Sequence, residues 1–237
     1  MSHRFATFTA PAPRLAVCLL LAALTTVGCA HLPYVLTENK DTIVAVDVAL
    51  EPDAVLDNRA STGKTHITLV RGFIRSSEVH LLSAAVANVM ATTRFEDFNL
   101  TATGYRTGTW NGVSGTAMTV DGSPALRRLE ERMVDAFRLF AVDDVETAEE
   151  FIVTPDGAEM DDDAMRAVER FVPDASGLNF RPHALVGSAQ AEAAKKLESQ
   201  QFAPFTFKPA GAAVYQLGRQ GTAERLLWSW TGEPGAK

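Results

Sequence analysis

The order of strand-like and helix-like segments is the feature that most constrains how this chain can fold. β-branched and alternating segments predict strands, and apolar residues at helical spacing predict helices. The expected order is strands 42–50 and 64–70, a helix from 79, strands 98–105 and 115–120, a helix 125–140, a strand 178–186, a helix 189–200, and strands 205–217 and 225–230. Each half thus offers a strand, a helix and a pair of strands. This order predicts an α+β fold, with an antiparallel sheet and helices on its outside.

Residues 142–176 interrupt this pattern with a local excess of acidic side chains and one expected helix, 163–171. We interpret the segment as an acidic insertion between the two halves. Asp161-Asp162-Asp163 might suggest calcium, but the run lacks the alternating spacing and the glycine of a calcium loop. We therefore expect a solvated acidic surface, with no metal and no cofactor.

The N-terminus has the pattern of an export signal. Arg4 and Arg14 precede an apolar run, 15–24, which is too short for an ordinary membrane-spanning helix. The ending Val27-Gly28-Cys29 resembles a bacterial lipobox and would make Cys29 a lipidated first residue. Ordinary cleavage after Ala30 is the competing interpretation.

These features divide the chain into a signal peptide (1–29), a tether (30–41) and a folded domain (42–237). The expected location is the periplasm, with a lipid anchor in the outer membrane if Cys29 is acylated. Cys18 and Cys29 are the only cysteines, so the mature body has no internal disulfide, cysteine nucleophile or thiolate metal site.

The net charge of −7 argues against binding to long nucleic acid, which requires a basic surface. A small phosphorylated ligand in a locally basic pocket remains compatible with this charge. We therefore expect a small nucleotide or a short oligonucleotide as partner.

Two histidines sit in similar strand contexts. Alternation places Lys64, His66 and Thr68 on one face of the first strand, and Arg181 and His183 on one face of the second. If these strands lie side by side, two imidazoles and two cations converge on one groove. One imidazole can then accept a proton while the other donates one, and the cations stabilise phosphate oxygens.

The His66-Ile67-Thr68 sequence resembles the His-X-Thr/Ser signature of the 2H phosphoesterase superfamily, which includes 2′-5′ RNA ligase-like proteins and cyclic phosphodiesterases. His183-Ala184-Leu185 is similar to the second copy of that signature, with Arg-Pro-His as its lead-in. The C-terminal segments 214–219 and 226–228 resemble the closing hairpin of the family. The resemblance covers about 42–230 and implies two pseudo-symmetric lobes around a central groove.

The resemblance implies a metal-independent phosphodiesterase acting on a 2′,3′-cyclic phosphate or a 2′-5′ linkage. His66 and His183 would be the catalytic acid and base, and Thr68, Lys64 and Arg181 would bind phosphate. Further residues are expected along the groove, where they could stack on a base: Tyr105, Trp110 and Tyr215.

Leu185 departs from the family pattern, because it stands where a Thr or Ser hydroxyl is expected. Tyr215, Ser188 or Arg181 could supply the missing donor. If none does, the alternative function is a non-catalytic lipoprotein that binds a phosphorylated ligand or an envelope partner. A third reading is a structural lipoprotein with a vestigial groove.

Overall fold

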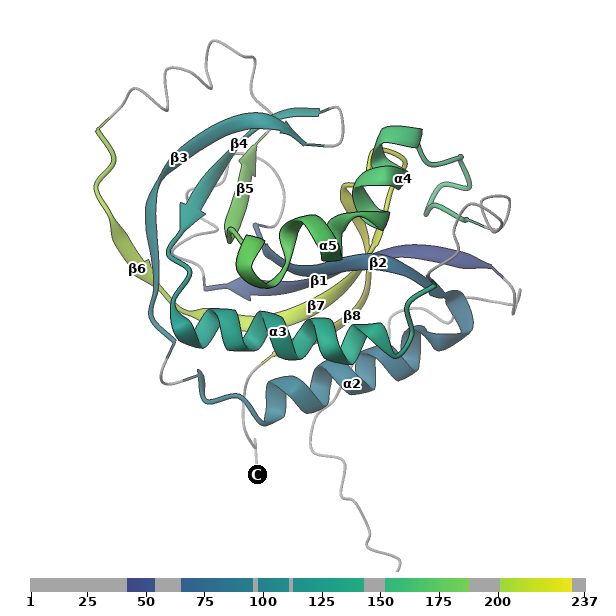
Figure 1. Cartoon of the computed structure of the whole chain (residues 1–237), viewed down its shortest axis with the longest axis horizontal. Helices are drawn as coiled ribbons and strands as arrows, with labels where there is room; N and C mark the ends of the chain where they lie inside the picture. The colour runs from purple at the N-terminus through teal and green to yellow at the C-terminus, as the bar shows by residue number, and fades with distance from the viewer. Residues whose placement is uncertain are drawn as a thin grey trace, which may run out of the picture.

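The computed structural model describes residues 42–53, 65–95, 98–110, 113–142, 152–187 and 201–231. Its strands are β1 (Ile43–Pro52), β2 (Ile67–Arg75), β3 (Leu100–Trp110), β4 (Val113–Val120), β5 (His183–Gly187), β6 (Phe205–Phe207), β7 (Pro209–Leu217) and β8 (Ala223–Thr231). They form one antiparallel sheet in the order β6-β3-β4-β5-β2-β1-β7-β8 (Figure 1). The sheet consists of two four-stranded halves that meet where β5 lies beside β2.

Two long helices, α2 (Val79–Ala91) and α3 (Pro124–Arg138), run side by side along one face of the sheet (Figure 1). Alternate residues of β1, including Val44, Val46 and Val48, point toward this layer and form the main core with it. The backbone N–H of Leu126 donates to the hydroxyl of Ser123, which caps the start of α3. The predicted α+β fold, an antiparallel sheet with outer helices, is confirmed.

The opposite face of the sheet is covered at one end by the described part of the acidic segment, which contains α4 (Asp162–Glu169) and α5 (Phe171–Ala175). Ala164 and Val168 on α4 pack against Ile43 and Ala45, the residues of β1 that alternate with the main core. The acidic side chains of α4 point away from the sheet: Asp163, for example, is exposed and forms an ion pair with Arg166. The predicted solvated acidic surface is therefore the exposed side of the amphipathic helix α4, whose other side packs on the sheet.

A single residue, Lys208, separates β6 from β7, although these strands pair with β3 and β1 in different halves of the sheet. The sheet therefore has to curl until its two halves approach each other at this point (Figure 1). Backbone contacts fasten the link, because Asp53 N–H donates to Lys208 O and Lys208 N–H donates to an Asp53 carboxylate oxygen. The prediction of one continuous strand over 205–217 was wrong for this reason.

Two other strand boundaries differ from the predictions in ways that matter for the site. β2 begins after His66 and continues to Arg75. β5 begins at His183, because the segment before it forms a 3₁₀ turn, Gly177–Asn179, and then reaches Pro182, which has no backbone N–H to donate. Arg181 thus precedes the strand instead of alternating with His183 along it. Among the described residues, no helix is long and apolar enough to cross a membrane.

Candidate functional site

The joint between the two halves of the sheet determines where the predicted residues lie. β2 and β5 pair at Ile67 and Ala184, and both side chains are buried in the main core beneath the helices. Directly paired residues of antiparallel strands share a face, and their chain neighbours point to the other face. His66, Thr68, His183 and Leu185 therefore all lie on the face away from α2 and α3.

Continuing this register by one residue in each direction places Thr68 opposite His183 and His66 opposite Leu185. His66 and His183 are then diagonal neighbours, and diagonal residues on paired strands are about 7–8 Å apart, with their Cβ atoms somewhat closer. The same rows extend into β4, where Thr119 pairs with His183 and Ala117 pairs with Leu185. The structure thus brings both histidines and Thr68 together on one surface.

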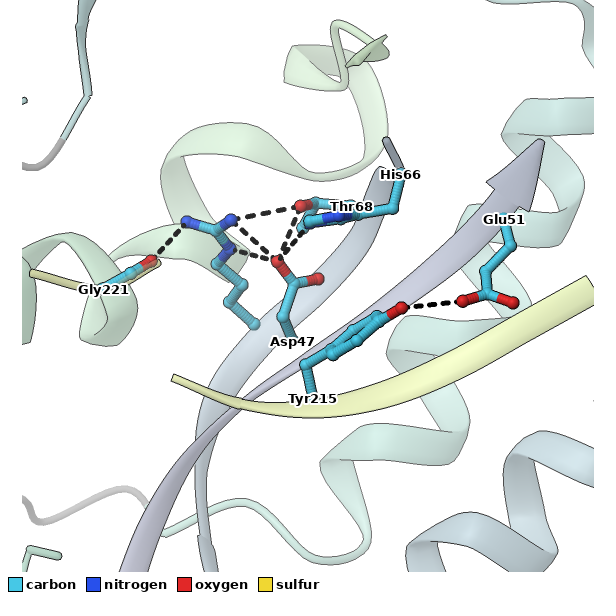
Figure 2. A network of polar contacts seen from close by, with 7 residues as sticks. Asp47, Glu51, His66, Thr68, Tyr215 and Gly221 are labelled. Carbon is cyan, nitrogen blue, oxygen red and sulfur yellow. Dashed lines mark hydrogen bonds and ion pairs between the residues drawn. The ribbon is translucent and has the colours of Figure 1, made fainter. Parts of the chain in front are cut away.

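Asp47 lies beside these residues on β1 and has no exposure to solvent. Its Oδ2 atom accepts hydrogen bonds from the Thr68 hydroxyl at 2.8 Å and from Arg71 Nε at 2.8 Å, and a second Arg71 nitrogen lies 2.7 Å away (Figure 2). The His66 Nε2 atom is 3.6 Å from the same oxygen, an ion-pair distance when the imidazole is protonated. Asp47 therefore connects β1 to Thr68 and Arg71 of β2 and to His66, which directly precedes that strand.

A β-bulge explains how both Thr68 and Arg71 reach one carboxylate. The register between β1 and β2 shifts between Val48 and Ala49, and both Leu69 and Val70 are buried on the core side of β2. The extra residue returns Arg71 to the same face as Thr68, as bulges re-aim side chains. Arg71 can therefore also donate to the Thr68 oxygen at 3.3 Å.

Asp47 is held as a carboxylate. Burial alone would raise its pKa, but the charge of Arg71 and the contacts with His66 and Thr68 outweigh burial and lower the pKa to about 2. The other oxygen, Oδ1, is buried and has no hydrogen-bond partner among the described residues. The carboxylate consequently directs its interactions through Oδ2, toward Thr68, Arg71 and His66.

The ring of Tyr215 stacks against the imidazole of His66. The two ring centroids are 5.4 Å apart and the planes differ by 30°. Tyr215 lies on β7, where it pairs with Asp47 of β1, and it packs with Ala49 and Ala213. Its hydroxyl donates to Glu51 at 2.7 Å (Figure 2). Tyr215 is only 8% exposed, so it supports His66 and offers little surface to a base.

His183 is oriented by the backbone that precedes it. Its Nδ1 atom lies 2.9 Å from Arg181 O, so a proton on Nδ1 donates to this carbonyl and leaves Nε2 as an acceptor in the neutral ring. Burial lowers the pKa of His183 and the positive charges of Arg106 and Arg71 lower it further, although the Arg181 carbonyl opposes this change. These effects favour the neutral form of the His183 imidazole.

A cleft of about 260 Å³ opens beside His183 on the side away from the joint with β2. Thr103, Thr119 and three arginines are among the residues that line it: Arg106, Arg127 and Arg181. Arg181, predicted to share a strand face with His183, reaches this cleft from the turn before β5.

The remaining predicted residues lie elsewhere. Tyr105, expected in the groove, pairs with Met118 on the helix-covered face and contacts Phe202 edge-on. Trp110 ends β3, and its side chain is outside the described residues. Lys64, Ser188 and Cys29 also lie outside them, as do the signal peptide, the tether and the predicted helix 189–200.

Sequence reasoning missed Asp47 and Arg71. One signal was present, because Asp47 is the only charged residue in the otherwise apolar run 43–50. A carboxylate in a doubly buried strand requires a charged or hydrogen-bonding partner. The bulge that brings Arg71 onto the same face could not be read from simple alternation.

Within the described part of the chain, no three His, Cys, Asp or Glu side chains gather in a way that could hold a metal ion. No protein-family model matches the chain, and no curated protein matches it.

Solved structures of one E. coli protein do match. The chain is similar to LigT in its apo form, with 14% sequence identity and a TM-score of 0.40. It is likewise similar to LigT complexed with ATP and with 3′-AMP, at 12% identity each and TM-scores of 0.37 and 0.38. Each match covers 80% of this chain and 98% of LigT. At this identity the likeness concerns the fold alone.

Proposed function

We propose that the protein is a metal-independent phosphodiesterase that hydrolyses a 2′,3′-cyclic phosphate or a 2′-5′ linkage in a small nucleotide. The observation that carries this proposal is the register at Ile67 and Ala184, from which His66 and His183 follow as diagonal neighbours on one face of the sheet. A phosphate between them would meet one imidazole on each side. The resemblance of His66-Ile67-Thr68 to the 2H signature supports the substrate class.

The two histidines have different surroundings and so receive different roles. His183 has a lowered pKa and an Nε2 acceptor, so it takes a proton from the attacking water. The water oxygen bonds to phosphorus as the bond to the ribose oxygen breaks. His66, 3.6 Å from the Asp47 carboxylate, gives its proton to that leaving oxygen. The products are a phosphomonoester and a ribose hydroxyl.

Thr68 can bind the phosphate only by changing its hydrogen bonds. A threonine hydroxyl has one proton, and that of Thr68 goes to Asp47 in this structure. Turning the hydroxyl toward a phosphate oxygen leaves Asp47 paired with Arg71, which lies at 2.7 Å. The carboxylate therefore keeps a charged partner when Thr68 engages the substrate.

The alternative function, a non-catalytic phosphate-binding protein, is favoured by one observation. Leu185 is 43% exposed on the same face as His183, so an apolar side chain occupies the position where the second signature has a hydroxyl. Losing one preorganised donor typically costs a factor of about 10²–10³ in rate.

The test is hydrolysis of 2′,3′-cyclic nucleotides and 2′-5′ dinucleotides by the purified protein in the presence of a chelator. Turnover should fall at least about 10²-fold in His66→Asn and in His183→Asn, as expected for loss of an acid or base. His80→Asn, an exposed residue of α2, is the matched control. Turnover that needs added metal, or that survives both substitutions, would exclude the mechanism. A nucleotide-dependent rise in Tm without turnover would favour the binding protein.

We also propose that the chain is exported to the periplasm and anchored to the outer membrane through Cys29. The charged and apolar segments before Val27-Gly28-Cys29 support this proposal. Cells grown with a tagged fatty acid should label the wild-type protein and not Cys29→Ser. An unlabelled mature chain beginning at His31 would instead indicate ordinary signal cleavage.

A further inference from the structure

The cleft beside His183 concentrates positive charge in a chain that carries a net charge of −7. Arg106, Arg127 and Arg181 line it, and within the described part of the chain Asp121 is the one carboxylate among its lining residues. This surface has the opposite sign to the molecule as a whole, so it favours an anionic ligand.

Two of the three arginines donate hydrogen bonds to backbone carbonyl oxygens, and Arg127 also interacts with the charge of Glu130. Arg127 donates through Nε to Gly122 O at 3.1 Å and through a terminal nitrogen to Phe180 O at 3.4 Å. Arg181 donates to Leu178 O at 2.9 Å and to the same Phe180 O at 3.1 Å. Carbonyl oxygens fix the direction of a guanidinium without cancelling its charge. These cations are therefore positioned before any ligand arrives.

The third arginine and two hydroxyls come from the sheet. Arg106 pairs with Ala117, which pairs with Leu185, so Arg106 lies on the same face as the two histidines. Thr103 and Thr119 line the cleft as well, with their hydroxyl oxygens 3.0 Å apart.

The cleft lies on the far side of His183 from His66. Along β4, Ala117 is level with Leu185 and Thr119 is level with His183, and Asp121 comes two residues later. Two residues of extended chain span about 6.6 Å. This step is comparable with the spacing of successive phosphates along a nucleic-acid strand.

We propose that this cleft binds a second phosphate group, so that the substrate is a nucleotide or short oligonucleotide with a terminal phosphomonoester one nucleoside away from the scissile phosphate. This inference rests on the proposed function for the position of the scissile phosphate. Arg181 and Arg106 contact the phosphomonoester, and Asp121 opposes it.

The test compares the binding of adenosine 3′-monophosphate and adenosine 3′,5′-bisphosphate to the full protein by titration calorimetry at low salt. The bisphosphate should bind about tenfold more tightly, the gain expected from charged hydrogen bonds to one more phosphate. Arg181→Gln and Arg106→Gln should bring the ratio of the two Kd values close to one. Asp121→Asn should increase the ratio, because it removes the opposing charge.

Arg138→Gln is the matched control, since it removes the same charge from an exposed position at the far end of α3. The ratio should stay at its wild-type value in this variant. Equal affinities in the wild type, a failure of the bisphosphate to bind, or an unchanged ratio in both cleft variants would overturn the inference. A preference for the bisphosphate without turnover of cyclic nucleotides would support the cleft and contradict the proposed catalysis. Turnover of cyclic nucleotides with equal affinities for the two ligands would support the proposed catalysis and contradict the second phosphate site.

Discussion

The Thr68 hydroxyl donates a 2.8 Å hydrogen bond to Asp47, a carboxylate with no exposure to solvent. This bond joins Thr68, the last residue of the His66-Ile67-Thr68 sequence, to the carboxylate of Asp47 in the middle of β1. The same carboxylate oxygen contacts Arg71 and lies near His66. The candidate site therefore contains a buried ion pair as well as the two histidines, and this pair has measurable consequences for stability.

The losses of stability caused by replacing Asp47 and by replacing Arg71 should not add. Asp47→Asn leaves the Arg71 charge in a mostly buried position, and breaking such a pair costs about 3 kcal/mol of the free energy of unfolding. The double variant Asp47→Asn/Arg71→Gln removes both charges and should lose less than the sum of the two single losses. Urea denaturation of the four proteins measures the coupling. Additive losses would show that the two groups do not interact.

The stability of the protein should fall at acid pH because of Asp47. The pKa of Asp47 is lowered to about 2 in the folded protein from 3.8 in the unfolded chain. The unfolded chain therefore binds this proton first, and the contribution is fully present above about pH 4 and is lost as pH falls toward 2. Its size is on the order of 2 kcal/mol. Denaturation curves at several pH values should show this slope in the wild type, and Asp47→Asn should flatten it.

The imidazole of His183 should titrate below 6.5, the ordinary value for histidine. Because the folded protein binds this proton less readily than the unfolded chain, His183 favours folding above pH 6.5 and loses this contribution as pH falls. Arg106→Gln should raise the pKa of His183 by removing a nearby positive charge. Nitrogen-15 NMR of the ring measures both the pKa and the proton on Nδ1. No movement in Arg106→Gln, or equal movement in Arg138→Gln, would contradict the arrangement.

Leu185→Thr should increase turnover of a 2′,3′-cyclic nucleotide by about tenfold or more, because a hydroxyl then stands where the second signature has one. The free energy of unfolding should change by less than about 1 kcal/mol, since Leu185 is 43% exposed. Leu185→Ala provides the control, because it removes the same apolar surface without adding a donor. A rate that falls in Leu185→Thr would mean that the leucine itself contacts substrate.

Much of the fold could be predicted from local patterns. Apolar residues at helical spacing predicted the helix 125–140, which forms as α3, because a helical period is set within a few residues. Alternation placed His66 and Thr68 on one face correctly. The division of 205–217 into β6 and β7 could not be predicted, because it depends on which distant strands each part joins.

The candidate site was predicted in part for a similar reason. The histidines stood out because each lies in a strand-like segment with a cation two residues earlier. Arg71 could not be recognised as part of the site, because the bulge between β1 and β2 places its side chain on the opposite face from the one that alternation predicts. Arg181 was expected along a strand, but the turn before Pro182 directs it into the cleft instead.

Lys208 joins the two halves of the curled sheet covalently, because it links β6 to β7. Among the described residues, the two halves also pair as neighbouring strands at one position, Ile67 and Ala184. His66 and His183 lie on opposite sides of this joint, so a change in how β2 and β5 pair would alter the distance between the two imidazoles.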